Sequence, residues 1–248
     1  MLNKNKKLYI IYIGIFILIS CLYTYYTNSI NETFNNKGET IYPPDSIQTY
    51  ISNVIYINLD KRTDRKAEIE KELTVFNPEK IQRISAVADA EYPYVGCTKS
   101  HLKALKIARE NDWDNVLILE DDAIWADIEN AYPVFEKLVQ QPFDVIMLGG
   151  TFAKYNHSTY RIKKAQSSAS YLVNKSYYNT LIANIEGSIR NFKPRVTTES
   201  EFAIDLAVFG PLQAKDNWFI VAPALMIQSP SHSDIVKKHV DYTNLFAK

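Results

Sequence analysis

The feature that most constrains this chain is a short apolar run that ends in three consecutive acids. Residues 116–119 read Val-Leu-Ile-Leu, and Glu120, Asp121 and Asp122 follow directly. A short, branched, apolar run bounded by polar turn residues is typical of a buried strand in an α/β sheet. Ligands of open α/β sheets gather at the carboxyl ends of the strands. The sequence therefore predicts that these acids lie where an α/β protein binds its ligand.

The acidic triplet indicates a positive partner, because adjacent carboxylates repel one another and are costly to bury unpaired. Side chains alternate along a strand, so we expect Glu120 and Asp122 to converge while Asp121 faces away. Such a D-x-D-like pair of oxygen donors suits Mg²⁺ or Mn²⁺, which can also bridge to a phosphate. The alternative is that Asp121 or Asp122 serves as the N-cap of a following helix.

Strand and helix patterns alternate along the rest of the chain, which predicts one α/β domain. Further strands are expected at residues 53–60, 81–87, 144–150, 167–173 and 218–225. Helices are expected from Thr63, after His101, over 128–139 and over 176–189. Another helical stretch is expected to carry Glu199, Glu201 and Asp205, of which Glu201 and Asp205 share one face by their i, i+4 spacing. Residues 226–235 are expected to form a polar loop.

The N-terminal region differs from the rest of the chain. Residues 8–26 carry no charge, and about 19 residues at about 1.5 Å each match a hydrocarbon core of about 30 Å. Lysines precede this segment, which predicts a cytosolic tail over residues 1–7, a transmembrane signal anchor over 8–26, a stem over 27–51 and a globular domain over 52–248. A cleaved signal peptide is the alternative, although tyrosines occupy the region of a cleavage site.

This topology predicts a single-pass type II membrane protein with its domain in the ER or Golgi lumen, or otherwise outside the cytosol. The stem is polar and contains Gly38 and the pair Pro43-Pro44. Asn31, Asn156 and Asn174 each begin an N-glycosylation acceptor pattern, which is weak support for a glycoprotein.

Composition excludes several classes of protein. Lysine plus arginine and aspartate plus glutamate both number 28, so no global positive field attracts nucleic acid. The two cysteines, Cys21 and Cys97, predict a fold that does not depend on disulfides, and no Cys/His set shows zinc spacing. P-loop, dinucleotide-binding and α/β-hydrolase glycine motifs do not occur in the sequence.

Four segments, taken in order, resemble glycosyltransferase family 25, the lipooligosaccharide and procollagen galactosyltransferases. They are Ile-Tyr-Ile-Asn-Leu-Asp-Lys-Arg-Thr-Asp-Arg at 55–65, Gly-Cys-Thr-Lys-Ser-His at 96–101, Leu-Ile-Leu-Glu-Asp-Asp-Ala at 117–123 and Ser-Tyr-Leu-Val at 170–173. Asp205 and residues 228–234 are weaker matches. The chain departs from the family pattern at Ala90, where the family tends to have glycine, and at Tyr94-Val95, where it usually carries an acid.

The resemblance implies a GT-A-like single domain with a mixed, mostly parallel central sheet flanked by helices. It also implies a metal-dependent, inverting transfer of galactose or glucose from a UDP-sugar to a hydroxyl of a protein or glycan, with Mn²⁺ or Mg²⁺. By matched position, the nucleotide-sugar would contact Asn58, Arg62, Arg65, Asp89, Ser100 and His101. The metal would be held by Glu120, Asp121, Asp122 and His232, and the catalytic base would be Asp205, with Glu201 or Glu199 as substitutes.

Simpler interpretations compete with these assignments. Arg62 and Arg65 follow a strand, where arginine can grip phosphate, but solvated surface charge is an equal alternative. A catalytically inactive, membrane-tethered binding or adhesion module of the same fold is one rival function. A glycoside hydrolase is another, and it would need two carboxylates about 5 to 9.5 Å apart and no metal.

Overall fold

The computed structural model describes residues 42–247. The predicted cytosolic tail, the transmembrane anchor and the stem as far as residue 41 lie outside the described residues. Within the described part of the chain, no helix combines the length and the apolar character needed to cross a membrane.

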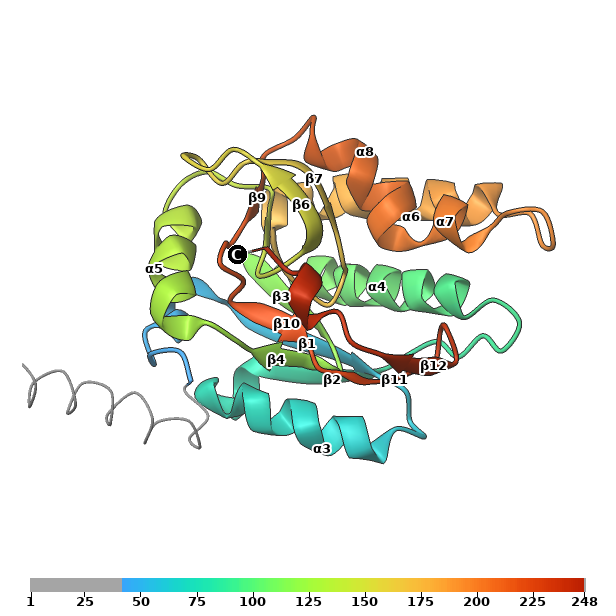
Figure 1. The fold of residues 1–248 in the computed structure, drawn as a ribbon, viewed down its shortest axis with the longest axis horizontal. Helices are drawn as coiled ribbons and strands as arrows, with labels where there is room; N and C mark the ends of the chain where they lie inside the picture. The colour runs from blue at the N-terminus through green and yellow to red at the C-terminus, as the bar shows by residue number, and fades with distance from the viewer. Residues whose placement is uncertain (1–41, 248) are drawn as a thin grey trace, which may run out of the picture. The chain divides into compact units, whose positions relative to one another are not determined.

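The domain is built on a six-stranded sheet with the order β2-β1-β3-β8-β5-β9 (Figure 1). Its strands are β1 (Asn53–Asn58), β2 (Ile81–Ser85), β3 (Asn115–Glu120), β5 (Val145–Met147), β8 (Ser170–Asn174) and β9 (Trp218–Ile220). Strand β8 runs antiparallel to its neighbours β3 and β5, and the other pairs are parallel. The expected mixed, mostly parallel sheet is therefore confirmed.

Helices cover both faces of this sheet (Figure 1). They are α2 (Ile47–Tyr50), α3 (Thr63–Glu72), α4 (Pro93–Glu110), α5 (Ile128–Val139), α6 (Tyr178–Asn191), α7 (Glu199–Phe202), α8 (Gly210–Gln213) and a π-helical segment η5 (Asp205–Phe209). Single 3₁₀ turns lie at Leu73–Val75, Pro78–Lys80, Lys175–Tyr177 and Thr243–Leu245.

Alternation along the central strands explains why two hydrophobic cores form. Leu117 and Leu119 of β3 belong to the core that includes residues of α3 and α5. Val116 and Ile118 belong to the other core, which includes residues of α4 and α6. All four side chains are fully buried, as expected for a strand that is covered on both faces.

Three short two-stranded sheets surround the central one. They are β4 (Ala123–Trp125) with β10 (Met226–Gln228), β6 (Thr151–Tyr155) with β7 (Ile162–Gln166), and β11 (Ser231–Ser233) with β12 (Lys238–Val240). The predicted strand over 218–225 is therefore split into β9 and β10, and the predicted loop over 226–235 contains β10 and β11. Pro223 lies at the break, where its missing N–H cannot join a strand ladder.

Two helix boundaries differ from expectation. Helix α4 begins at Pro93, a residue suited to the first helical position, so residues 96–101 lie inside the helix and not before it. Helix α7 ends at Phe202 and Asp205 opens η5, so Glu201 and Asp205 do not share one regular helix face.

Part of the predicted stem belongs to the folded domain. Ile47 of α2 and Ile51 are fully buried in the core that contains α3 and α5. Lys80 also donates to the Gln48 and Ile51 carbonyl oxygens, at 2.7 and 3.0 Å. The packed domain therefore includes residues before Ser52.

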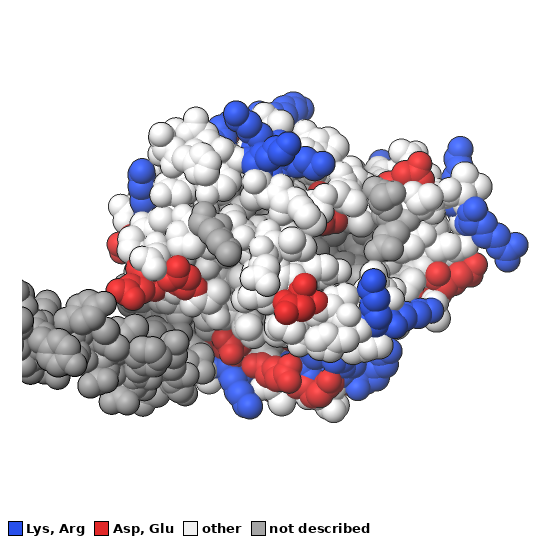
Figure 2. Space-filling model, viewed as in Figure 1, with Lys and Arg blue, Asp and Glu red and all other residues white. Residues whose placement is uncertain are grey.

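Charged side chains of both signs are interleaved over the face drawn in Figure 2. Lysines and arginines gather in the upper part of that view, where Figure 1 draws β6 and β7. Exposed Lys154, Lys163 and Lys164 lie on these two strands. With a formal net charge of zero, local groups decide what each site attracts.

Gly96 tests the close packing of α4 against the loop after β2. A Cβ at this position would lie 2.4 Å from the Val87 carbonyl oxygen, so Gly96→Ala is expected to lower the free energy of unfolding by about 1–3 kcal/mol. Gly187→Ala in α6 is the matched control, because its Cβ would meet only Arg190 Nη2 at 3.8 Å. Alanine favours a helix interior by up to about 1 kcal/mol. Urea denaturation measures the stability of both variants. Equal unfolding midpoints for Gly96→Ala and Gly187→Ala would contradict the close packing of α4 at Gly96.

Candidate functional site

A cleft of ≈ 530 Å³ lies at the carboxyl ends of β1, β2 and β3. Its other walls come from α4 and from the segment around β11. Its charged and metal-ligating side chains belong to Lys61, Arg65, Asp89, Cys97, His101, Glu120, Asp121, Asp122, His232, Asp234 and Lys237. The acidic triplet therefore lines a cleft at the strand ends, as the sequence predicts.

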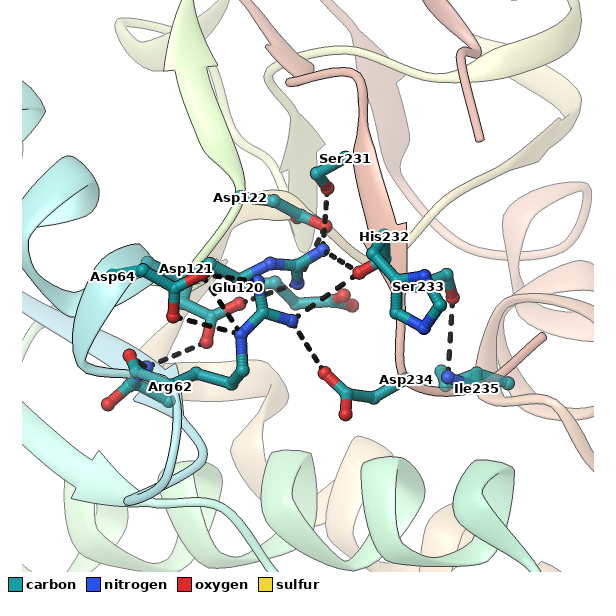
Figure 3. Close-up of polar contacts among 12 residues, drawn as sticks. Arg62, Asp64, Glu120, Asp121, Asp122, Ser231, His232, Ser233, Asp234 and Ile235 are labelled. Atoms are coloured by element: carbon teal, nitrogen blue, oxygen red, sulfur yellow. Dashed lines mark hydrogen bonds and ion pairs between the residues drawn. The ribbon is translucent and has the colours of Figure 1, made fainter. Parts of the chain in front are cut away.

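Arg65 connects the acids to the β11 segment. Its Nη1 lies 2.9 Å from Asp121 Oδ1 and 3.2 Å from Asp122 Oδ2. Its Nη2 donates to Ser231 Oγ at 2.6 Å and to the His232 carbonyl oxygen at 2.9 Å (Figure 3). The side chains of Arg65, Asp121 and Asp122 are each about 10% exposed. Arg65, predicted to contact phosphate, thus binds carboxylates of its own chain.

Asn58 is also used within the protein. Its Nδ2 donates to Asp121 Oδ2 at 2.7 Å and to the Arg62 carbonyl oxygen at 3.0 Å. Its Oδ1 accepts from Arg83 Nε and Nη2 at 3.1 and 2.9 Å. Asn58 therefore holds the end of β1 in place. Both oxygens of Asp121 have a partner, because Oδ2 accepts from Asn58 and Oδ1 pairs with Arg65.

Arg62 forms a second ion-pair group at the edge of the cleft (Figure 3). Its Nη2 lies 2.8 Å from Asp64 Oδ2 and its Nη1 lies 2.6 Å from Asp234 Oδ2. Lys61 Nζ lies 2.7 Å from the other oxygen of Asp234. Arg62, like Arg65, meets carboxylates where the sequence predicted phosphate contacts.

The direction of Asp121 differs from the expectation, because Asp121 lines the cleft beside Asp122 instead of facing away from it. Asp121 and Asp122 both reach Arg65, whereas Glu120 turns toward His101 and Ser168. The reason is that β3 ends at Glu120 and the next two residues form a turn before β4. Strand alternation does not apply to a turn.

The electrostatics favour a cation beside Asp122. Burial, with the nearby Glu120 carboxylate, raises the pKa of Asp122 to about 7, although Arg65 opposes the shift. Asp122 Oδ1 is buried and has no hydrogen-bond partner in the described part of the chain. Carboxylate oxygens are the ligands that Mg²⁺ and Mn²⁺ prefer. Glu120 and Asp122 therefore suit such an ion, whereas both oxygens of Asp121 are already bound by Asn58 and Arg65.

His101 lines the cleft from α4, and its side chain is fully buried. Its Nδ1 lies 2.8 Å from the Tyr171 hydroxyl and its Nε2 lies 3.3 Å from Glu120 Oε1. Cys97 stands one helical turn earlier on α4, and one ligand atom of each of Cys97, His101 and Glu120 lies within 4.8 Å of the others. Burial and the carboxylates of Glu120, Asp205 and Asp122 raise the pKa of the Cys97 thiol.

This three-residue group was not predicted from the sequence. The i, i+4 spacing of Cys97 and His101 is a signal that both side chains share a helix face. Glu120 comes from β3, and no spacing along the chain brings it to α4.

The remaining predicted residues are divided between the cleft and other places. Asp89 lines the cleft and accepts from the Tyr92 amide at 2.8 Å. The Ser100 hydroxyl donates to the Gly96 carbonyl oxygen and accepts from the Val87 amide, both at 2.8 Å. The exposed His232 lines the cleft edge, and its carbonyl oxygen accepts a hydrogen bond from Arg65.

The two candidate bases differ in position. Asp205 is half-buried and its Oδ2 accepts from the Ser167 amide at 3.0 Å. Burial raises the pKa of Asp205, and its charge acts on Cys97, which lines the cleft. Glu201 is exposed, accepts from Thr198 at 2.8 Å and lines a different pocket beside α6. Neither Asp205 nor Glu201 is among the residues that line the cleft with the acidic triplet, and Asp205 acts on it through the lining residue Cys97.

Comparisons with known proteins give partial likenesses. No protein-family model and no curated protein matches the chain. One similar solved structure is a glycosyltransferase involved in the glycosylation of the major capsid of PBCV-1, at 13% identity, TM-score 0.45, 73% of this chain and 93% of that one. Mannose-1-phosphate geranyltransferase from Thermus thermophilus shows 8% identity, TM-score 0.44 and coverage of 73% and 76%. 4-Diphosphocytidyl-2C-methyl-D-erythritol synthase from Anaerococcus prevotii shows 16% identity, TM-score 0.38 and coverage of 75% and 76%.

Replacing Arg65 tests whether its ion pairs organise the site. Arg65→Met keeps the apolar stem but leaves Asp121 and Asp122 buried without their cation, so the free energy of unfolding is expected to fall by about 3–5 kcal/mol. Lys66→Met is the matched control, because its pair with Glu70 is 40% and 46% exposed. Losing such a pair costs about 0.5 kcal/mol. Chemical denaturation of both variants measures the difference, and similar losses would contradict the role of Arg65.

Proposed function

We propose that this chain is a metal-dependent, inverting glycosyltransferase that transfers galactose or glucose from a UDP-sugar to a hydroxyl of a protein or glycan. The observation that carries the proposal is the convergence of separate segments on one cleft. Residues 55–65, 96–101 and 117–123, which resemble glycosyltransferase family 25, all contribute to its lining. The weaker match at 228–234 contributes as well. The GT-A-like character of the mixed sheet is part of the same proposal.

The charges of the cleft suit a nucleotide diphosphate together with a divalent cation. Lys61 and Lys237 line it, and the Lys61 side chain is 68% exposed, so its ammonium group can also reach a phosphate. Glu120 and Asp122 would hold Mn²⁺ or Mg²⁺, which when bound would stabilise negative charge on the departing diphosphate. Asp121, paired with Arg65 and Asn58, would orient its neighbours without binding the ion.

The transfer itself needs a group that accepts a proton. The acceptor hydroxyl would attack the anomeric carbon from the face opposite UDP, forming the new glycosidic bond as the bond to the UDP oxygen breaks. We assign the proton to Asp205, whose pKa is raised by burial, as suits a carboxylate that must accept a proton. Inversion at the anomeric carbon follows from this single displacement.

The location and the acceptor are proposed from the N-terminal sequence. An anchor over residues 8–26 would make the chain a type II membrane protein with its domain in the ER or Golgi lumen or otherwise outside the cytosol. A domain in that location would meet glycoprotein acceptors, and it could itself carry N-glycans.

UDP release from a panel of UDP-sugars, with Mn²⁺ or with EDTA, tests the function. We expect one donor to be hydrolysed slowly without acceptor, and EDTA to abolish the reaction. Hydrolysis of a glycoside that resists EDTA would favour a glycoside hydrolase instead.

One observation favours a second candidate, a catalytically inactive binding or adhesion module. Arg62 and Arg65, the expected phosphate ligands, are already paired with carboxylates of the protein. No UDP release from any donor, together with no rise in melting temperature with UDP, would support that alternative.

The assignment of the base predicts a difference between two acids. Asp205→Asn is expected to reduce transfer by about 10²–10⁴-fold while UDP binding stays unchanged, because only the proton acceptor is lost. Glu201→Gln is the control and is expected to keep wild-type turnover, since Glu201 lines another pocket. Turnover numbers and UDP affinity measured for both variants decide the point. Equal turnover in Asp205→Asn and the wild type would remove Asp205 as the base.

A further inference from the structure

Three side chains with different donor atoms meet on one wall of the cleft. Cys97 supplies a sulfur, His101 a ring nitrogen and Glu120 a carboxylate oxygen, and these atoms lie within 4.8 Å of one another. Cys97 and His101 come from one face of α4, and Glu120 is the last residue of β3. All three line the cleft.

We propose that Cys97, His101 and Glu120 form a binding site for a borderline transition-metal ion of the Zn²⁺ class. Sulfur and imidazole nitrogen are ligands that Zn²⁺ and Co²⁺ prefer, whereas Mg²⁺ and Mn²⁺ prefer oxygen alone. The site is therefore distinct in chemistry from the oxygen site that Glu120 and Asp122 would offer to a hard cation.

The spacing of the donor atoms fits a tetrahedral ion after a small movement. Zinc binds sulfur at about 2.3 Å and nitrogen or oxygen at about 2.0–2.2 Å, which puts neighbouring ligands about 3.3–3.8 Å apart. His101 Nε2 and Glu120 Oε1 already lie 3.3 Å apart. The other separations are at most 4.8 Å, so closing them needs side-chain shifts of at most about 1 Å.

Groups behind the ligands hold two of them in orientation. The Tyr171 hydroxyl lies 2.8 Å from His101 Nδ1, on the side of the ring opposite Nε2. Ser168 Oγ donates to Glu120 Oε1 at 2.6 Å. Partners of this kind fix the tautomer and direction of metal ligands, and replacing them typically costs about 10–100-fold in metal affinity.

The position of the group in the cleft would let a bound ion take a further ligand, which the closed site of a structural zinc does not allow. Three protein ligands leave a fourth position for water or an anionic ligand, as in catalytic zinc sites. That position would face the cleft, because all three ligands line it. Binding here would occupy Glu120, so a Zn²⁺-class ion and a hard cation would compete for that carboxylate.

The test uses Co²⁺ as a spectroscopic probe in the full-length chain with Cys21→Ser. Cys97 is then the only cysteine, so any thiolate-to-cobalt charge-transfer absorption reports ligation by its sulfur. We expect this absorption to saturate at one Co²⁺ per chain and to disappear when Zn²⁺ displaces the probe. No sugar donor is present, so the outcome is independent of the proposed transferase activity.

Variants in the same background separate ligands from bystanders. His101→Ala is expected to weaken Co²⁺ binding at least tenfold, and Tyr171→Phe to weaken it about 10–100-fold. Lys99→Ala, between the two helix ligands in sequence, is expected to bind as tightly as the parent because its side chain is 42% exposed and is not a ligand. Absence of the charge-transfer absorption in the parent would overturn the proposal. Equal Co²⁺ affinity in the His101→Ala variant and the parent would overturn it too.

A second measurement does not require the His101→Ala or Tyr171→Phe variant to fold. The rate of Cys97 alkylation by iodoacetamide in the Cys21→Ser chain is expected to fall at least tenfold when stoichiometric Zn²⁺ is added, because the thiolate becomes a ligand. Mg²⁺ at the same concentration is expected to leave the rate unchanged. Equal rates with and without Zn²⁺ would contradict the site.

Discussion

The ion pairs of Arg65 with Asp121 and Asp122 are the interaction on which the site depends. They join the start of α3, the turn after β3 and, through Ser231 and His232, the β11 segment. Two carboxylates this deeply buried would be strongly destabilising without a cation. Arg65 therefore holds α3, the turn after β3 and the β11 segment together around the cleft. One arginine does not balance three acids, and the unpaired Asp122 Oδ1 and the adjacent Glu120 mark where further positive charge fits.

The sequence predicted the central sheet well because burial on both faces leaves a direct pattern. The apolar run at 116–119 lies in β3, and its alternate side chains enter the two cores as a covered strand requires. The position of the acids at the strand end was predictable for the same reason. The start of α4 was missed although Pro93 marks it, because proline is as common in turns as at the first position of a helix.

The contacts within the site could not be predicted, since each joins residues far apart in the chain. Arg65 and Asp121 are 56 residues apart, and Asn58 and Asp121 are 63 apart. Sequence patterns identify an arginine beside a strand, but they do not tell whether it meets a phosphate or a carboxylate. The direction of Glu120 depends on the residue at which β3 stops, and boundaries of this kind are set by tertiary packing.

The most direct measurement is a crystal structure of this chain with UDP and Mn²⁺. We predict that the nucleotide binds in the cleft at the ends of β1, β2 and β3, with the Mn²⁺ between its diphosphate and the carboxylates of Glu120 and Asp122. UDP bound elsewhere, or a cleft that stays free of nucleotide at saturating UDP with the Arg65 ion pairs intact, would contradict a nucleotide-sugar site. That result would leave the cleft as a surface for a different ligand.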